Sequence, residues 1–377
     1  MNLKPGKVVL IPDSFKGTLS SVEVCRVLRG CVELRLPGCE VRAIPVADGG
    51  EGSVDAFLAA LGGEKVHARV AGPFFEPVES FYGLTDGGKT AIVEMAACAG
   101  LPLAGERRDP ALTTTYGVGE LIALAVEGGA RKIILGLGGS ATNDAGCGAA
   151  AALGVRFFDR TGTPFVPTGG TLGEVERIDV SAARERLRGV EITAMCDIDN
   201  PMYGENGAAY VFAPQKGAGP EQVRALDAGL RRLAGVMRRE LGMDFAELPG
   251  AGAAGAMGAG VTAFLGASLQ SGIESVLNAV DFDGAAADAD LIFTGEGRLD
   301  SQSLRGKVVI GVARRAKRLG KRVIAIVGGA EGELEAAYAE GVTAVFTTNR
   351  LPEPLSRSAP RAAENLAFTM DNILRLL

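Results

Sequence analysis

Short apolar runs alternate with amphipathic segments over the first and last parts of this chain. Residues 8–12 form an apolar run typical of a buried strand, and Ser20 and Glu23 then make a helix-start signal ahead of apolar positions at helical spacing. Further runs predict strands and helices over 41–46, 53–61, 291–293, 309–316, 323–327, 334–338, 344–347 and 364–377. This alternation predicts an α/β fold, in which both ends of the chain contribute to one doubly wound parallel sheet.

The middle of the chain has a different pattern. Prolines and glycines interrupt residues 71–86, and an apolar run follows them at 90–95. The stretch 279–290, rich in alanine and aspartate, reads as a connector. A chain of 377 residues commonly forms two domains, so we predict a discontinuous first domain with a second α/β domain of mixed sheet inserted into it, and a cleft between them. The predicted boundaries are 1–75 plus 285–377 for the first domain and 76–284 for the second.

The most informative stretch is residues 132–154, which reads as a strand, a glycine turn and an alanine-rich helix. A strand that passes through glycines into a helix start directs backbone N–H groups at one point, which suits a phosphate. Gly138, Gly139, Ser140, Thr142 and Asn143 are therefore predicted to bind nucleotide or phosphate, and Asp144 could hold Mg²⁺ or a substrate hydroxyl. The alternative is that these glycines only make a tight strand-to-helix turn.

Four more turns of this kind follow probable strands. They combine carboxylates with glycine or proline and span residues 13–17, 47–52, 197–201 and 294–301. Open α/β sheets bind ligands just beyond the carboxyl ends of their strands. We therefore expect these turns to line one cleft.

Charge and hydropathy exclude several classes of partner. The chain has 39 basic and 45 acidic residues, a net charge of −6, and no basic stripe interleaved with aromatic residues, so we expect no nucleic-acid binding. Its mean hydropathy is +0.20, yet no apolar run approaches the roughly 18 residues that a membrane span needs. The first apolar run is too short for a signal peptide, which predicts a cytoplasmic protein.

The scarcity of histidine narrows the chemistry. His67 is the single histidine, and the six cysteines form no C-x-x-C pair, so a zinc site or a triad built on histidine is improbable. His67 lies in an alternating stretch and is predicted to be a strand surface residue. Catalysis must then rely on carboxylates, lysines, backbone amides and a metal ion, which are the groups used in phosphoryl transfer.

Familiar nucleotide-binding motifs fit poorly. Gly306 and Lys307 are followed by Val308, and no upstream glycine completes a Walker motif. Residues 250–255 match G-x-G-x-x-G, but a loop ending in proline precedes them at 245–249 instead of a strand. A glycine loop that closes on substrate or nucleotide, with Gly252 and Gly255 as contacts, is the favoured interpretation over dinucleotide binding.

Six motifs occur in an order that resembles the bacterial type-1 glycerate kinases. They lie at 13–17, 47–52, 138–144, 212–218, 250–255 and 294–302, and the resemblance spans essentially the whole chain. It implies a Rossmann-like domain beside a second α/β domain with the active site between them. It also implies transfer of the ATP γ-phosphate to D-glycerate, usually at the 2-hydroxyl. Ala256 stands where another glycine is expected.

Roles for single residues are predicted from the chemistry of this reaction. Lys16 is the candidate charge clamp, and Asp197 the candidate that orients or deprotonates the attacking hydroxyl. The candidate substrate ligands are Asp13, Asp48, Gly49, Gly50, Glu51 and Asn200. Lys307 is a candidate for phosphate, and Glu296 and Asp300 join Asp144 as candidate metal ligands. Structural alternatives remain open: a surface lysine for Lys16, an Asx turn for Asp197, turn chemistry for Asp48 and Glu51, and a helix cap for Glu296.

The expected ligands are glycerate, ATP and Mg²⁺, and the expected assembly is a monomer or a homodimer. A kinase for another small hydroxy acid and a nucleotide-dependent sensor without turnover remain alternatives. The sequence leaves open which hydroxyl is phosphorylated.

Overall fold

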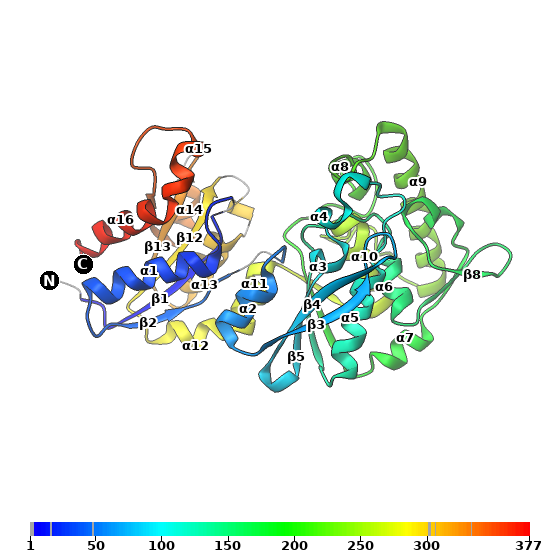
Figure 1. Ribbon diagram of the computed structural model, residues 1–377, viewed down its shortest axis with the longest axis horizontal. Helices are drawn as coiled ribbons and strands as arrows, with labels where there is room; N and C mark the ends of the chain where they lie inside the picture. The colour runs from blue at the N-terminus through cyan, green and yellow to red at the C-terminus, as the bar shows by residue number, and fades with distance from the viewer. Residues whose placement is uncertain (1–3, 16, 47–48, 301–302, 306, 333) are drawn as a thin grey trace. The chain divides into compact units, whose positions relative to one another are not determined.

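The structure is a computed structural model that describes residues 4–15, 17–46, 49–300, 303–305, 307–332 and 334–377 (Figure 1). Contacts divide the chain into two compact units, and both are discontinuous. The first comprises residues 1–48, 55–62 and 271–377, and the second comprises 49–54 and 63–270.

The first unit contains a five-stranded sheet whose strands are all parallel. Its order is β14 (Val342–Thr347), β13 (Val323–Ala330), β12 (Leu291–Leu299), β1 (Lys7–Pro12) and β2 (Glu40–Ala43). The helices of this unit are α1 (Ser21–Arg35), α2 (Ser53–Leu61), α11 (Gly272–Ala279), α12 (Phe282–Ala287), α13 (Val308–Arg318), α14 (Glu335–Ala339), α15 (Leu355–Ser358) and α16 (Ala362–Leu374). Two short 3₁₀ turns, Ser303–Arg305 and Ala359–Arg361, complete it.

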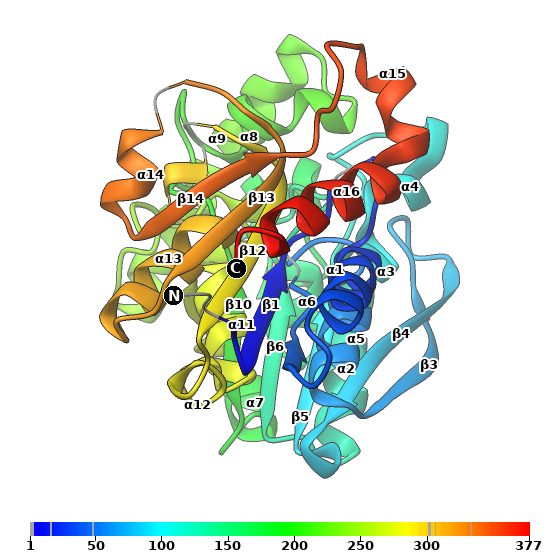
Figure 2. The same cartoon turned by 90° about the vertical axis from the view of Figure 1, so that its left-hand side faces the viewer.

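Helices cover both faces of this sheet, which explains why its strands read as unbroken apolar runs. Val8 and Leu10 of β1 belong to a core shared with α1 and α16, two helices that contact each other and lie next to one another in Figures 1 and 2. Val9 and Ile11 point to the other face and are also fully buried, and α13 contacts β1 and β12. The sheet is therefore doubly wound, as predicted.

The strand order reverses at β1, which pairs with β2 on one side and with β12 on the other. The N–H of Asp13, the residue after β1, donates to Gly295 O in β12 at 2.8 Å. Thr294 Oγ1 adds a bond to Ile11 O at 2.9 Å. In open α/β sheets this switch point, at the carboxyl ends of the strands, is the usual place for a ligand.

The second unit contains a six-stranded mixed sheet. Its order is β11 (Ser268–Gln270), β10 (Glu191–Met195), β6 (Lys132–Gly136), β5 (Thr90–Glu94), β4 (Pro77–Thr85) and β3 (Glu64–Ala71). The first four strands are parallel, while β4 pairs antiparallel with both β5 and β3. A small sheet of β8 (Pro164–Phe165), β7 (Arg156–Phe158) and β9 (Arg177–Asp179) lies in the same unit.

The helices of the second unit include one long amphipathic segment, α9. They are α3 (Ala96–Ala99), α4 (Leu101–Ala104), α5 (Tyr116–Glu127), α6 (Cys147–Ala152), α7 (Ser181–Arg186), α8 (Ala208–Phe212), α9 (Pro220–Leu241) and α10 (Ala253–Leu265). Its 3₁₀ turns are Asp86–Gly88, Gly105–Arg107, Gly169–Glu174 and Pro214–Lys216. Among the described residues, no helix is long and apolar enough to span a membrane.

Most predicted elements are confirmed. The predicted α/β class, with one doubly wound parallel sheet and one mixed sheet, is observed. Ser20 caps α1 and forms a capping box with Glu23, as its position suggested. His67 lies exposed in β3, also as predicted.

Two local predictions are wrong. Residues 294–299 are not a turn, because β12 continues through Gly295 to Leu299. The glycine serves close strand packing, since a Cβ on Gly295 would lie 2.1 Å from Ile326 O in β13. The predicted connector 279–290 contains α12, which Asp281 caps by accepting from the Gly284 N–H.

Candidate active site

A polar loop follows β6 in the second unit and contains several of the predicted ligands. Thr142 and Asn143 are fully buried in it, and Ser140 is nearly so. Within the described part of the chain, Thr142 Oγ1 and both polar atoms of the Asn143 amide have no hydrogen-bond partner. Buried polar groups are almost always paired, so these three atoms mark a place where a ligand or water is expected.

Lys216 enters this loop from the 3₁₀ turn Pro214–Lys216 and is 2% exposed. Its Nζ donates to Ser140 Oγ at 2.8 Å and to Thr142 O at 2.6 Å. Burial, which disfavours the charged amine, lowers the pKa of Lys216 to about 7, although the nearby Asp144 carboxylate acts in the opposite direction. The structure thus brings a buried lysine to the residues predicted to hold an anion.

Asp144 lies beneath the loop and is fully buried. Its Oδ2 accepts from Thr115 N at 2.7 Å, Thr115 Oγ1 at 2.8 Å and Gly148 N at 3.2 Å, and its Oδ1 accepts from Gly146 N at 3.1 Å. Burial raises its pKa, while these donors lower it. Through these four hydrogen bonds Asp144 braces the loop, and its predicted role as a metal ligand stays a prediction.

The prediction that a helix begins directly after the glycines of this loop is wrong. Helix α6 begins at Cys147, and the turn at Gly138 and Gly139 lies eight residues earlier, so the helix terminus does not directly follow the glycines. Gly139 is exposed in this turn, at φ 75°.

The glycines of segment 47–52 pack against those of the loop. Gly138 donates its N–H to Gly49 O at 2.9 Å. A Cβ on Gly136 would lie 2.4 Å from Gly49 O, and one on Gly138 would lie 2.6 Å from Gly50 Cα. Close contact with the backbone of Gly49 and Gly50 therefore requires glycine at positions 136 and 138.

The segment 250–256 packs against the same loop. A Cβ on Gly255 would lie 2.0 Å from Thr142 O, and one on Gly252 would lie 2.4 Å from Pro201 O. Ala254, Gly255 and Ala256 all have positive φ, at 54°, 69° and 68°. Ala256, the residue predicted to replace a glycine, thus occupies a conformation that favours glycine. Turns, not a strand, precede the segment, which agrees with the rejection of a dinucleotide site.

The other candidates of the second unit follow β10 or precede α2. Asp197 follows β10 and is exposed, and Glu51 is exposed as well. Asn200 is half-buried, and its Nδ2 donates to Asn206 O at 2.7 Å. The candidates Lys16 and Asp48 lie outside the described residues.

In the first unit, the carboxylates at the switch point form a second cluster. Glu296 is 6% exposed and Asp13 is 8% exposed. Burial is the main cause that raises the pKa of Glu296 to about 7; Asp13 and Asp300 raise it further, while a hydrogen bond with Ser303 and the charge of Lys307 lower it. The charges of the predicted residues Asp13, Asp300 and Lys307 thus all act on the Glu296 carboxylate.

The two polar residues after β12 are fixed by local bonds. Asp300 Oδ1 accepts from Ser303 N at 3.2 Å, and Asp300 N donates to Ser303 Oγ at 3.2 Å. Lys307 is the N-cap of α13, and its N–H donates to Ser303 O at 3.2 Å. Glu296 does not cap this helix.

Carboxylate oxygens such as these are the protein ligands that Mg²⁺ prefers. Among the described residues, no group of three or more His, Cys, Asp or Glu side chains is arranged to hold a metal by itself. Mg²⁺ in kinases needs only one or two protein carboxylates beside the phosphates. Glu296 fits this requirement, because its buried Oε1 has no hydrogen-bond partner among the described residues.

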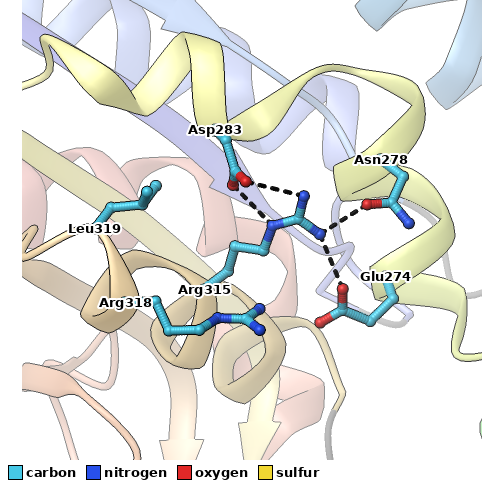
Figure 3. A pocket seen from close by; sticks show the side chains of 6 residues that line it. All are labelled: Glu274, Asn278, Asp283, Arg315, Arg318 and Leu319. Atoms are coloured by element: carbon cyan, nitrogen blue, oxygen red, sulfur yellow. Dashed lines mark hydrogen bonds and ion pairs between the residues drawn. The ribbon is translucent and has the colours of Figure 1, made fainter.

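A further pocket of about 490 Å³ opens between α11, α12 and α13 of the first unit (Figure 3). Arg315 donates there to Asp283 at 2.7 and 3.2 Å, to Glu274 at 3.0 Å and to Asn278 at 2.7 Å (Figure 3). Its guanidinium is thus satisfied by groups of two neighbouring helices, which points to a structural clamp.

Comparison with known proteins identifies the family. The model of the family described as "Glycerate kinase family" matches residues 8–377. The chain belongs to the glycerate kinase family. The resemblance drawn from six ordered motifs is confirmed, and with it the expectation of a kinase.

Relatives of this glycerate kinase family member match it over almost their whole length. It is 45% identical to a glycerate kinase of Bacillus cereus (strain ATCC 10987 / NRS 248) over 97% of both chains. It is 44% identical to a glycerate 2-kinase of Escherichia coli (strain K12) over 98% of both chains. The crystal structure of a provisionally named glycerate kinase 2 from Salmonella typhimurium LT2 superposes with a TM-score of 0.88, at 43% identity, covering 98% of this chain and 97% of that one.

In this glycerate kinase family member, Lys216 is the residue for which sequence reasoning assigned no role. It lies in the recognised motif 212–218, so its importance could have been suspected. The available signal was a single charge within a run of small and apolar residues. Its partners are more than seventy residues earlier in the chain, and only the fold brings them together.

Proposed function

We propose that this protein transfers the γ-phosphate of ATP to the 2-hydroxyl of D-glycerate and produces 2-phosphoglycerate and ADP. The observation that carries this proposal is the match to the Escherichia coli glycerate 2-kinase, which is 44% identical over 98% of both chains. The family assignment over residues 8–377 supports the wider activity, phosphorylation of glycerate.

The two clusters suit the two substrates of this reaction. The cluster with Lys216 offers a buried ammonium and neutral polar groups, which suit a small anionic acceptor. The carboxylates Asp13, Glu296 and Asp300 lie at the switch point of a doubly wound sheet, where nucleotides commonly bind. We assign the acceptor to the first cluster, whereas the sequence pattern predicted nucleotide or phosphate at Ser140, Thr142 and Asn143, and we assign the nucleotide to the second cluster.

Glu296, with Asp13 and Asp300 near it, would hold Mg²⁺ together with the nucleotide phosphates, and Lys307 would contact a phosphate. The ion would supply positive charge that neutralises the phosphoryl group during transfer. The carboxylates would orient the nucleotide. Burial of Glu296 keeps a negative charge there costly until a cation is present.

Asp197 is our candidate for the residue that orients or deprotonates the acceptor hydroxyl. It is exposed and follows the carboxyl end of β10, so a substrate can reach it. Lys16, Asp48, Glu51 and Asn200 remain proposed contacts of substrate or phosphate from the sequence pattern.

The test is phosphorus NMR of the product formed from ATP, Mg²⁺ and D-glycerate. A resonance assigned to 2-phosphoglycerate supports the proposal, and one assigned to 3-phosphoglycerate contradicts the choice of hydroxyl. ADP release measured with glycerate, glycolate, lactate and dihydroxyacetone shows whether glycerate is the preferred acceptor. Binding of ATP without any ADP formed would instead indicate a sensor.

A further inference from the structure

Three buried polar atoms in the loop after β6 lack a partner within the described residues. They are Thr142 Oγ1, Asn143 Oδ1 and Asn143 Nδ2. An unpaired buried donor or acceptor carries most of its desolvation penalty, so a side chain such as Asn143, with both amide atoms unpaired, is unfavourable unless a partner comes from outside the chain.

The chemistry of that partner follows from the groups around it. An amide presents one donating and one accepting end, so it pairs with a molecule that carries both a hydrogen-bond acceptor and a donor such as a hydroxyl. Beside it, the ammonium of Lys216 has three N–H donors, of which Ser140 Oγ and Thr142 O receive two. Among the described residues, no carboxylate forms an ion pair with Lys216, and the oxygens of Asp144 already accept from Thr115, Gly146 and Gly148.

The segments around Asn143 are closely packed. A Cβ on Gly255 would lie 2.0 Å from Thr142 O, and Ala145 and Ala256 are fully buried. A small anion that also carries hydroxyl groups would offer partners to the Asn143 amide and a negative charge to Lys216.

We propose that Asn143 binds the hydroxy-acid end of the acceptor, with Lys216 as the positioning residue that holds the loop and supplies positive charge. Asn143 Nδ2 donates to the substrate carboxylate, and Asn143 Oδ1 accepts from the hydroxyl that is not phosphorylated. This inference rests on the proposed function, since it names the contact by which a glycerate kinase would recognise its acceptor.

The decisive experiment compares glycerate with its uncharged amide, glyceramide, in Asn143→Asp. A carboxylate at this position repels the substrate carboxylate but can accept from an amide NH₂ group. We expect kcat/KM for glycerate to fall about 100-fold, mainly through KM, while KM for ATP stays within about threefold. The loss for glyceramide should be at least about tenfold smaller. Equal losses for both acceptors, or a change confined to KM for ATP, would overturn the inference.

Asn365→Asp is the matched control, because Asn365 is also a buried asparagine but lies in α16 of the first unit. It introduces the same chemical change and should leave KM for glycerate unchanged in enzyme that remains folded.

A second variant addresses the case in which Asn143→Asp fails to fold. Asn143→Leu has a similar volume and removes both unpaired atoms, so the free protein should melt at the same temperature or higher. Glycerate added without nucleotide should raise the melting temperature of the wild type but not of Asn143→Leu. A glycerate-dependent rise that survives in Asn143→Leu would overturn the inference and indicate bound water as the partner.

These outcomes are separable from failure of the proposed function. If the wild type forms no phosphoglycerate, the proposed function fails whatever the variants do. If the wild type forms it and Asn143 variants keep their KM for glycerate, the proposed subsite alone fails.

Discussion

Replacing Lys216 by methionine tests the energetics of its buried charge. An unfolded chain keeps this lysine protonated up to its ordinary pKa of 10.5, whereas burial lowers the folded pKa to about 7. A group whose folded pKa is depressed in this way destabilises the fold while the pH is below the folded pKa. That destabilisation disappears as the pH rises from about 7 to 10.5.

The magnitude follows from the two pKa values. A difference of 10.5 minus about 7, at 1.36 kcal/mol per pH unit, corresponds to about 5 kcal/mol below pH 7. Methionine removes this penalty but also the hydrogen bonds to Ser140 Oγ and Thr142 O, which contribute about 1 kcal/mol each. Lys216→Met should therefore be about 3 kcal/mol more stable than the wild type at pH 6, and about 1 kcal/mol less stable at pH 10.

Urea unfolding at pH 6, 7, 8, 9 and 10, followed by circular dichroism, measures this difference. The two proteins should have equal free energies of unfolding near pH 9, where the remaining penalty of the charged lysine equals the contribution of the two hydrogen bonds that methionine lacks. Lys216→Arg is the control, because its guanidinium stays charged at every pH used, so the stability difference between it and Lys216→Met should not vary with pH. A stability difference between Lys216→Met and the wild type that does not vary with pH would refute the reasoning.

Four further predictions concern both units. Gly255→Ala should lower the free energy of unfolding by about 3 kcal/mol, because residue 255 has a φ of +69° and its Cβ would lie 2.0 Å from the carbonyl oxygen of Thr142. Its control is Gly235→Ala in α9, where a Cβ would meet nothing within 4 Å. This control should raise the free energy of unfolding by about 0.5–1 kcal/mol in the same urea assay. Arg315→Met should cost about 1–2 kcal/mol in that assay, because it leaves two carboxylates without their shared partner. Glu296→Gln should remove a loss of stability that the wild type shows between pH 4.5 and about 7, and a pH-independent difference between the two would contradict this. Asp197→Asn should lower kcat at least about 100-fold with little change in KM, and near-normal turnover would exclude Asp197 from the proposed role.

Local signals explain which parts of the fold could be predicted. Helix α1 was located by the Ser20 and Glu23 capping pair, and α2 by its apolar spacing, since both signals act within a few residues. Strand β12 was underestimated because Gly295 and Gly297 resemble a turn in sequence. Glycine is required at position 295 because β13 approaches too closely for a side chain, and no local pattern reports that distance.

The carboxylate cluster of the first unit could be predicted because the carboxyl ends of parallel strands lie at the same edge of a sheet. Asp13 and Asp300 directly follow strands of one parallel sheet and Glu296 lies within β12, so their proximity follows from topology. The role of Asp144 could not be read in this way. A carboxylate after a glycine turn suits a metal as well as it suits backbone N–H groups, and no local pattern reports the contacts with Thr115 and its neighbours.

Residues 49–54 pack with the second unit, while 55–62 pack with the first. This hexapeptide supplies Gly49 O to the Gly138 N–H, and the Val54 N–H to Glu94 Oε2 at 3.0 Å. A truncated gene that encodes only residues 63–270 would therefore lack residues 49–54, which belong to the same unit. Any fusion or exchange of the larger unit between homologous enzymes has to transplant these six amino acids as well, so the boundary for such engineering is not one cut in the coding sequence.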